Sequence, residues 1–313
     1  MIDHEVVRLL PADRFGNVLA VKSFPHGLSG AAVYDVATDA GDFVVRILAE
    51  ADLEQWHRYI SLLRVVADAG IAPRLSWVDE GERATVSPKI GGQLAEALAD
   101  PEARPRAMAS VVDTLARLHR LPAAAFAPAD PIAAARSLWS MQSVKPGFPA
   151  WASPAAALID RAATLLDDDP RRVPSHDDMN PTNVLWDGTR VWLVDWDASG
   201  LTHPYYDLAV FAMFLRLDDA TALDLLARQE HAAIAPAQAE TFRALRRLGA
   251  IFCGTTFLRL AGDLETTVPQ HLDEVPTLSQ VYARLRTGEL ALRTPVGQGT
   301  FGAAMLKDAI TAD

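Results

Sequence analysis

Apolar residues recur along the first 88 residues with two spacings, which predict two kinds of element. From Phe24 to Ile47, short β-branched and aromatic runs alternate with glycine-containing turns, a pattern typical of strands joined by hairpins. From Asp52 to Ala69 the apolar positions recur every three or four residues, and Gly70 follows. This spacing predicts one long helix that ends at the glycine.

Helical spacing dominates the rest of the chain. The predicted helices cover residues 102–121, one or two stretches between 131 and 170, and then 207–217, 219–230, 237–262 and 277–287. The tail from Thr294 to Gly302 has three glycines and a proline, which predicts a loosely held segment. Between the two patterns lies a turn-rich stretch, Ser87–Gly92, which we expect to be a hinge. The sequence therefore predicts an α+β protein with two lobes, residues 1–88 and 89–313.

Composition narrows the possible partners and setting. The net charge of −11 over 313 residues argues against nucleic acid, whose phosphates require a basic surface. This charge is compatible with a cationic ligand, although solubility explains it equally well. Cys253 is the only cysteine and lies in an apolar helical run, so we expect it to be buried in a reduced, cytoplasmic protein. No apolar stretch is long enough to suggest a membrane span, and nothing indicates the oligomeric state.

The richest chemical signal lies between Ser175 and Asp197. His176, Asp178 and Asn183 have the spacing H-x-D-x-x-x-x-N, and an Asp-Gly turn then separates two short apolar runs. Asp-Gly between such runs predicts a hairpin, which would place Asn183 opposite Val194 and Asp195. Hard oxygen atoms at one hairpin end suit magnesium, which takes few protein ligands and fills its shell with phosphate and water.

This arrangement predicts magnesium-dependent phosphoryl transfer. Asn183 and Asp195, with Asp197 as a further candidate, would hold the metal, and Asp178 would accept the proton of an acceptor hydroxyl. Two other interpretations are a surface hairpin with solvated acids and a metal-dependent phosphoesterase with His176 as a ligand. A single histidine leaves the second short of ligands, so we expect His176 to brace the loop through a backbone hydrogen bond.

The same segment resembles the aminoglycoside phosphotransferase and choline kinase superfamily. HDDMNPTN follows the kinase pattern HRDxxPxN without a gap, Asp195-Trp196-Asp197 resembles the D-x-D that replaces the kinase DFG, and Pro204 to Ala209 resembles P-x-x-D-L-A. The resemblance implies a protein-kinase-like fold, with a small β-rich N-terminal lobe containing one long helix and a larger, mainly helical C-terminal lobe. It also implies ATP and Mg²⁺ as cofactors. We expect Asp207 to be a helix cap or brace rather than a catalyst.

Candidate nucleotide-binding residues lie in the N-terminal lobe. Gly27, Ser29 and Gly30 would allow backbone N–H groups to approach a triphosphate, although an ordinary hairpin turn explains them equally well. Ser87 and Lys89, in the predicted hinge, would contact the nucleotide.

Arg46 is a lone charge in an apolar strand and should have a partner. By resemblance it takes the place of the kinase lysine, which contacts the nucleotide phosphates and a helix glutamate. Relatives have that glutamate near His57 or Tyr59, where this chain has none, so Glu54 is the nearest candidate and Glu50 the second. Either residue could equally be a first-turn acid that complements the helix dipole.

The sequence thus predicts a kinase that phosphorylates a hydroxyl of a small molecule, such as an amino alcohol or an aminoglycoside. One alternative is a catalytically inactive nucleotide-binding protein of the same fold. Another is a protein kinase, against which we count the eleven residues between Asp195 and Asp207, too few for a long activation loop.

Overall fold

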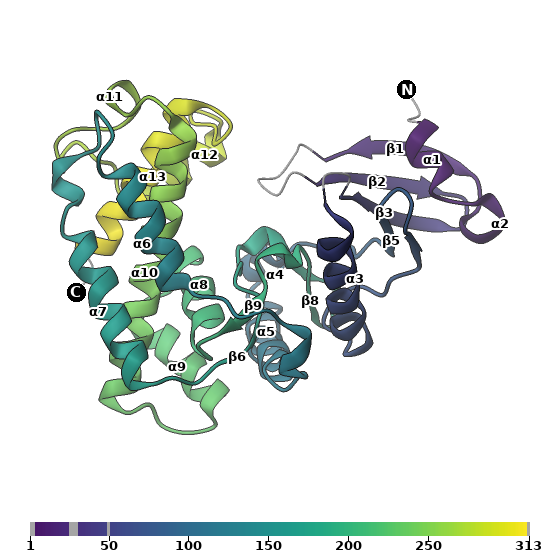
Figure 1. Cartoon of the computed structure of the whole chain (residues 1–313), viewed down its shortest axis with the longest axis horizontal. Helices are drawn as coiled ribbons and strands as arrows, with labels where there is room; N and C mark the ends of the chain where they lie inside the picture. Colours follow the sequence, from purple (N-terminus) through teal and green to yellow (C-terminus); the bar gives the residue numbers. More distant parts are fainter. Residues whose placement is uncertain (1–3, 25–30, 49–50, 312–313) are drawn as a thin grey trace. The chain divides into compact units, whose positions relative to one another are not determined.

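The computed structural model describes residues 4–24, 31–48 and 51–311 (Figure 1). The chain forms two compact units, one of residues 1–127 and 173–201 and the other of residues 128–172 and 202–313. The predicted lobe boundary near residue 88 falls inside the first unit. Within the described residues, no helix is long and apolar enough to span a membrane.

The first unit contains a five-stranded antiparallel sheet with the strand order β1-β2-β3-β5-β4. Its strands are β1 (Val18–Ser23), β2 (Ala32–Thr38), β3 (Gly41–Ile47), β4 (Trp77–Asp79) and β5 (Ala84–Pro88), preceded by the short helices α1 (His4–Arg8) and α2 (Ala12–Phe15). Val45 of β3 pairs with Val86 of β5, and both lie in a core that includes Phe15 of α2. Since side chains alternate along a strand, Arg46 points to the opposite face from Val45.

Helix α3 (Leu53–Asp68) is the predicted long helix of this unit. It begins where the Asp52 side chain accepts a hydrogen bond from the Gln55 amide, and it ends at Gly70, whose φ of 64° favours glycine. Trp56 and Ile60 are among its buried residues. The unit continues with α4 (Leu94–Ala99), α5 (Arg104–Leu118) and the 3₁₀ turn η1 (Ala123–Ala125).

The predicted hairpin is confirmed. Strands β7 (Val184–Trp186) and β8 (Val191–Leu193) pair with Trp186 opposite Val191 and Val184 opposite Leu193. In the chain, β6 (Val173–Ser175) and the 3₁₀ turn η3 (Pro181–Asn183) precede this hairpin, and the 3₁₀ turn η4 (Trp196–Ala198) and β9 (Gly200–Thr202) follow it. Strands β6 and β9 pair with each other.

The second unit is helical, as expected for the later part of the chain. Its long helix α10 (Pro236–Ala261) packs against α6 (Pro131–Gln142), α7 (Ala155–Asp168), α8 (Tyr206–Phe214) and α13 (Pro295–Thr311) (Figure 1). The remaining elements are η2 (Ala150–Ala152), α9 (Asp219–Glu230), α11 (Leu264–Thr267) and α12 (Leu278–Thr287). Asp207, in the first turn of α8, is buried.

Two predictions in this unit are wrong. The glycine-rich tail is not loosely held: it forms α13, which packs on α10 so closely that a Cβ at Gly302 would lie 2.7 Å from the carbonyl oxygen of Gly254. The glycines thus allow two helix backbones to approach rather than breaking a helix. Cys253 is only partly buried, since α10 turns Ile251 and Gly254 inward and leaves Cys253 at the edge of that face.

Candidate active site

The hairpin joins the two halves of the catalytic motif. The backbone N–H of Val194 donates to the carbonyl oxygen of Asn183 across 3.0 Å, which extends the β7–β8 pairing by one step. Asp195 follows directly and adopts the left-handed conformation with φ 66°, which is uncommon for a residue other than glycine. The chain therefore turns sharply at Asp195 and enters η4, which carries Asp197.

Asp178 lies on the loop beside the hairpin and is held by Asn183. The amide nitrogen of Asn183 donates to Oδ2 of Asp178 across 2.8 Å and to the carbonyl oxygen of Asp178 across 3.2 Å. Burial raises the pKa of the Asp178 carboxyl, and the negative charge of Asp195 raises it further, against hydrogen bonds from Asn180 and Asn183. Asn183 therefore holds Asp178 at the open end of the hairpin, where Asp195 directly follows Val194.

His176 connects the loop to the hairpin. Its buried ring bonds through Nε2 to the carbonyl oxygen of Val194 across 3.0 Å, and its Nδ1 accepts a hydrogen bond of 3.4 Å from the backbone N–H of Asp178. The first contact requires a proton on Nε2 and the second a lone pair on Nδ1, so the neutral Nε2–H tautomer satisfies both. The ring also packs edge-on against Trp196, with centroids 4.6 Å apart. The predicted backbone hydrogen bond is therefore present.

Arg46 binds the acidic pair rather than a helix glutamate. Nη1 lies 3.0 Å from Oδ1 of Asp195, and Nη2 donates to Oδ2 of Asp197 across 2.5 Å. The predicted pairing of Arg46 with Glu54 is wrong, because Glu54 lies on the outer side of α3 and forms an exposed ion pair with Arg58. Glu50 lies outside the described residues.

The structure brings a residue to Arg46 that the sequence analysis did not select. The ring of Tyr59 faces the guanidinium, with 5.3 Å from Cζ of Arg46 to the ring centroid. The position of Tyr59 in the sequence could have indicated this contact with Arg46, because relatives are expected to have their helix glutamate near Tyr59.

Five other residues were predicted to bind the nucleotide, and the structure does not test this role for any of them. Gly27, Ser29 and Gly30 lie outside the described residues, so their role stays a prediction. Ser87 pairs with Val44 across the sheet, and Lys89 forms an ion pair of 2.6 Å with Asp35. Ser87 belongs to β5 and Lys89 directly follows this strand, and the contact of both residues with a nucleotide also stays a prediction.

The donor atoms fit a magnesium ion that shares its shell with phosphate. Asp195 and Asp197 supply carboxylate oxygens, and Oδ1 of Asp195 is buried with no hydrogen-bond partner among the described residues apart from its ion pair with Arg46. The described chain has no cluster of three or more His, Cys, Asp or Glu side chains that would hold a metal alone. A pair of carboxylates with the Asn183 amide is typical of Mg²⁺ bound together with a nucleotide.

The family follows from comparison with known proteins. A family model described as phosphotransferase enzyme family matches residues 20–246. The chain belongs to this family. A search of curated proteins found no match to this phosphotransferase.

Solved structures show that the enzyme has the fold of small-molecule kinases, as the sequence motifs implied. A choline/ethanolamine kinase family protein from Mesorhizobium loti has a TM-score of 0.65 and 17% identity, over 96% of this chain and 97% of its own. The choline kinase LicA from Streptococcus pneumoniae has a TM-score of 0.59 and 15% identity, and the match covers 77% of this chain and 84% of LicA. A thermostable mutant of the aminoglycoside phosphotransferase APH(4)-Ia has a TM-score of 0.58 and 16% identity, and the match covers 96% of this chain and 98% of the mutant.

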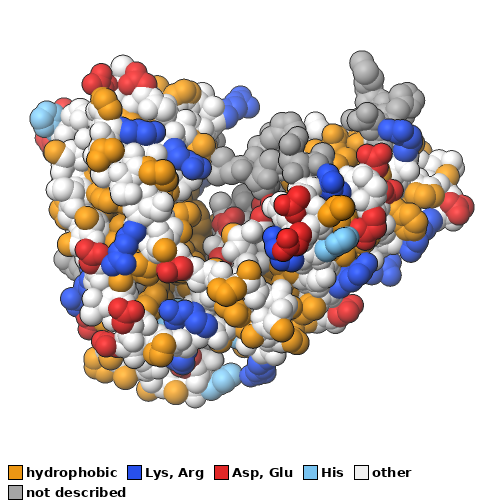
Figure 2. All heavy atoms as spheres, viewed as in Figure 1, with side chains coloured by type: hydrophobic (Ala, Val, Ile, Leu, Met, Phe, Trp, Pro, Cys, Tyr) orange, Lys and Arg blue, Asp and Glu red, His pale blue; other side chains and the backbone are white. Residues whose placement is uncertain are grey.

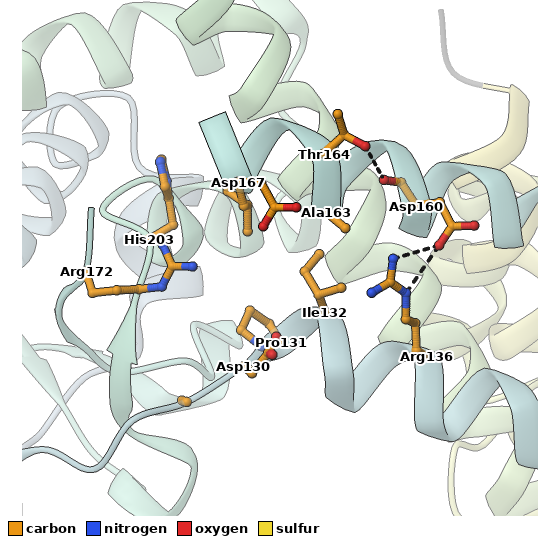
Figure 3. A pocket seen from close by; sticks show the side chains of 12 residues that line it. Asp130, Pro131, Ile132, Arg136, Asp160, Ala163, Thr164, Asp167, Arg172 and His203 are labelled. Atoms are coloured by element: carbon orange, nitrogen blue, oxygen red, sulfur yellow. Dashed lines mark hydrogen bonds and ion pairs between the residues drawn. The ribbon is translucent and has the colours of Figure 1, made fainter. Parts of the chain in front are cut away.

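A separate cavity of about 290 Å³ lies wholly within the second unit (Figure 3). Two of its acids have structural partners: Asp130 caps α6 by accepting from the Ala133 amide, and Asp160 pairs with Arg136 across 2.8 Å. The buried ring of His203, which also lines the cavity, bonds to Asp169.

Proposed function

We propose that the enzyme transfers the γ-phosphate of ATP, bound with Mg²⁺, to a hydroxyl group of a small molecule. The observation that carries the proposal is the gathering of Asp178, Asn183 and Asp195 around the open end of one hairpin. A protein that only binds nucleotide does not need a carboxyl held by the same asparagine that lies at the metal-binding end of the hairpin. This argues against the inactive alternative.

Arg46 would hold the phosphates. Its Nε is buried and has no hydrogen-bond partner among the described residues, so this N–H lacks the acceptor that a buried donor requires. A phosphate oxygen would supply that acceptor, with a charge-assisted hydrogen bond. Gly27, Ser29 and Gly30, which lie outside the described residues, remain the second candidates for phosphate contact.

Asn183, Asp195 and Asp197 would hold the metal, which neutralises charge on the β- and γ-phosphate oxygens when bound. The side-chain nitrogen Nδ2 of Asn183 donates a hydrogen bond to Asp178, so the side-chain oxygen Oδ1 of Asn183 would coordinate the metal. One short segment of chain thereby fixes the metal and the base relative to each other.

Asp178 would receive the proton of the acceptor hydroxyl and orient it for in-line attack. General bases work best when their pKa approaches the working pH, and the burial that raises the pKa of Asp178 moves it in that direction. The Asn183 amide keeps the carboxylate in one orientation.

Structures of the same fold support the nucleotide and the kind of acceptor. LicA has been solved in complex with AMP, which favours a nucleotide site here. The neighbours include choline, ethanolamine and aminoglycoside kinases, so an amino alcohol or amino sugar is the acceptor that we favour. On the face drawn in Figure 2, acidic and basic side chains are interspersed, and no basic stripe that would suit nucleic acid is visible there.

An acceptor screen tests the proposal. ADP release would be measured with Mg-ATP over amino alcohols, aminoglycosides, thiamine, sugars and a set of peptides, with Asp178→Asn as the catalytic control. We expect acceptor-dependent ADP release with a small molecule, which the control lacks while it still binds ATP. Release only with peptides would favour a protein kinase, and neither ADP release nor ATP binding by the wild type would refute the proposal.

A further inference from the structure

The cation of Arg46 is supported from two sides. Asp195 and Asp197 bind its terminal nitrogens on one side. On the side of α3, the described residues supply no carboxylate, because Glu54 points outward and pairs with Arg58. The side chain that meets the guanidinium there is Tyr59: its ring centroid lies 5.3 Å from Cζ of Arg46, and its hydroxyl forms a hydrogen bond with Arg46. This distance is within the range of a cation–π contact.

We propose that Tyr59 is a positioning residue for Arg46, and that its ring takes the place of a helix carboxylate in orienting the phosphate-binding guanidinium. The inference rests on the proposed function, since it assigns Arg46 to the phosphates of ATP. It concerns how this chain holds that arginine, which the family assignment does not specify.

Tyr59 is itself held on a rigid base. Trp56, one turn earlier on α3, is fully buried, and its ring centroid lies 6.4 Å from that of Tyr59. The indole N–H of Trp56 donates to the carboxylate of Glu80, which fixes the ring from the other end. Because the Asp52 cap fixes the start of the helix, the position of the Tyr59 ring is set by α3 as a whole.

The electrostatics favour a neutral aromatic partner. Burial raises the pKa of Tyr59 well above its ordinary value, against the opposing effects of the Arg46 charge and of a hydrogen bond with the Arg46 side chain, so the phenol stays protonated. Asp195 and Asp197 already set two negative charges against the single charge of Arg46. A third carboxylate on α3 would add to this excess and weaken the attraction between Arg46 and a phosphate. A ring face orients the guanidinium without adding a full charge.

Three substitutions separate the ring from other contributions of this side chain. Tyr59→Phe keeps the ring and removes the hydroxyl, whereas Tyr59→Leu removes the ring. Tyr282→Leu is the matched control, since Tyr282 is also largely buried and packs against another ring, that of Phe301 at 6.0 Å. Each variant would be assayed for ATP binding by calorimetry, for ATP KM and kcat, and for thermal unfolding.

We expect Tyr59→Phe to bind ATP within about twofold of the wild type. Tyr59→Leu should raise both the ATP Kd and the ATP KM about tenfold, with a much smaller change in kcat. Tyr282→Leu should lower the melting temperature without changing the ATP Kd. A purely structural role for Tyr59 would instead lower stability in Tyr59→Leu and leave the ATP affinity of the folded protein unchanged.

A double-mutant cycle with Arg46→Met makes the test decisive. In that background, Tyr59→Leu should have no further effect on the ATP Kd. The proposal is overturned if the effect persists there, if Tyr59→Leu binds ATP like the wild type, or if Tyr59→Phe loses as much affinity as Tyr59→Leu. Should Tyr59→Leu fail to fold, Tyr59→Met replaces it in the cycle. If the wild type does not bind ATP, the proposed function fails, and the same cycle on the melting temperature still tests the contact between Tyr59 and Arg46.

Discussion

Replacing Arg46 by methionine should destabilise the protein far more than the same change at Arg58. Both arginines make an ion pair with a nitrogen–oxygen distance of 2.5 Å, one with Asp197 and the other with Glu54. The pairs differ in burial. The Arg46 side chain is 12% exposed, and the side chains of Arg58 and Glu54 are 63% and 82% exposed.

The size of the effect follows from the contacts. At an effective dielectric constant of about 20, each of the two ion pairs of Arg46 contributes roughly 5–7 kcal/mol of Coulomb energy, most of which desolvation offsets. The carboxylates of Asp195 and Asp197 are about one third exposed (38% and 31%). The net loss should therefore lie between that of an exposed pair, about 0–1 kcal/mol, and that of a broken buried pair, about 3–5 kcal/mol. We expect about 2–3 kcal/mol, or a melting temperature lower by roughly 3–5 °C for a chain of 313 residues.

Thermal unfolding followed by circular dichroism, in EDTA and in Mg²⁺, provides the assay. Arg58→Met should stay within about 0.5 kcal/mol of the wild type in both buffers. Arg46→Met should be destabilised in EDTA and recover part of the loss in Mg²⁺, because a divalent cation between Asp195 and Asp197 replaces the missing charge. If Arg46→Met melts like Arg58→Met in EDTA, Arg46 is not the counterion of the acidic pair. If Mg²⁺ brings no recovery, the two carboxylates are not a metal site.

Three further predictions concern the catalytic loop and the helical unit. Asp178→Asn should lower turnover by about 10²- to 10⁴-fold and raise the melting temperature near neutral pH. The pKa of the Asp178 carboxyl in the folded protein lies above the ordinary value of 3.8. The protonated carboxyl therefore stabilises the fold at low pH, and this stabilisation is lost as the pH rises through the folded pKa. The plots of melting temperature against pH for the variant and the wild type should converge below that pKa, and a parallel offset at all pH values would contradict this. His176→Phe keeps the ring but removes the hydrogen bond to the Val194 carbonyl, and we expect denaturant titration to show a loss of about 1–3 kcal/mol together with a lower kcat. Gly302→Val should cost about 1–3 kcal/mol by the same method, whereas Gly91→Ala, with no atom within 4 Å of the new Cβ, should stay within about 0.5 kcal/mol; equal effects would show that α13 does not pack as described.

The parts that the sequence predicted correctly are those fixed by nearby residues. The Asp187-Gly188 turn and its flanking apolar runs determine the register of β7 and β8, and this register alone brings Asn183 level with Val194. The start and end of α3 follow in the same way from an N-cap aspartate and a terminal glycine. Such features need no knowledge of the rest of the fold.

The partner of Arg46 was not predictable in this way. Asp197 is 151 positions away in sequence, and whether Glu54 or Tyr59 faces the sheet depends on the rotation of α3. That rotation is set by the apolar residues, chiefly Trp56 and Ile60, which must be buried. Two residues along a helix correspond to about 200°, so a helix that buries Trp56 must turn Glu54 outward. The helical pattern contained this information, but the family resemblance directed attention to the nearest glutamate.

The glycines of α13 are a second case in which a distant contact, and not the local sequence, decides the structure. Gly in a helix interior costs about 1 kcal/mol relative to alanine, so three glycines within nine residues predict a weak helix by local preference. That preference is outweighed where a partner helix needs the space. Gly302 of α13 and Gly254 of α10 each lie where a Cβ would come within 3.0 Å of the other's carbonyl oxygen, so each glycine makes room for the other backbone. Neither glycine by itself predicts this close approach of the two helices, because the two residues are 48 positions apart in the chain. A local pattern therefore predicts an element reliably only where its stability is decided locally, and α13 owes its stability to α10.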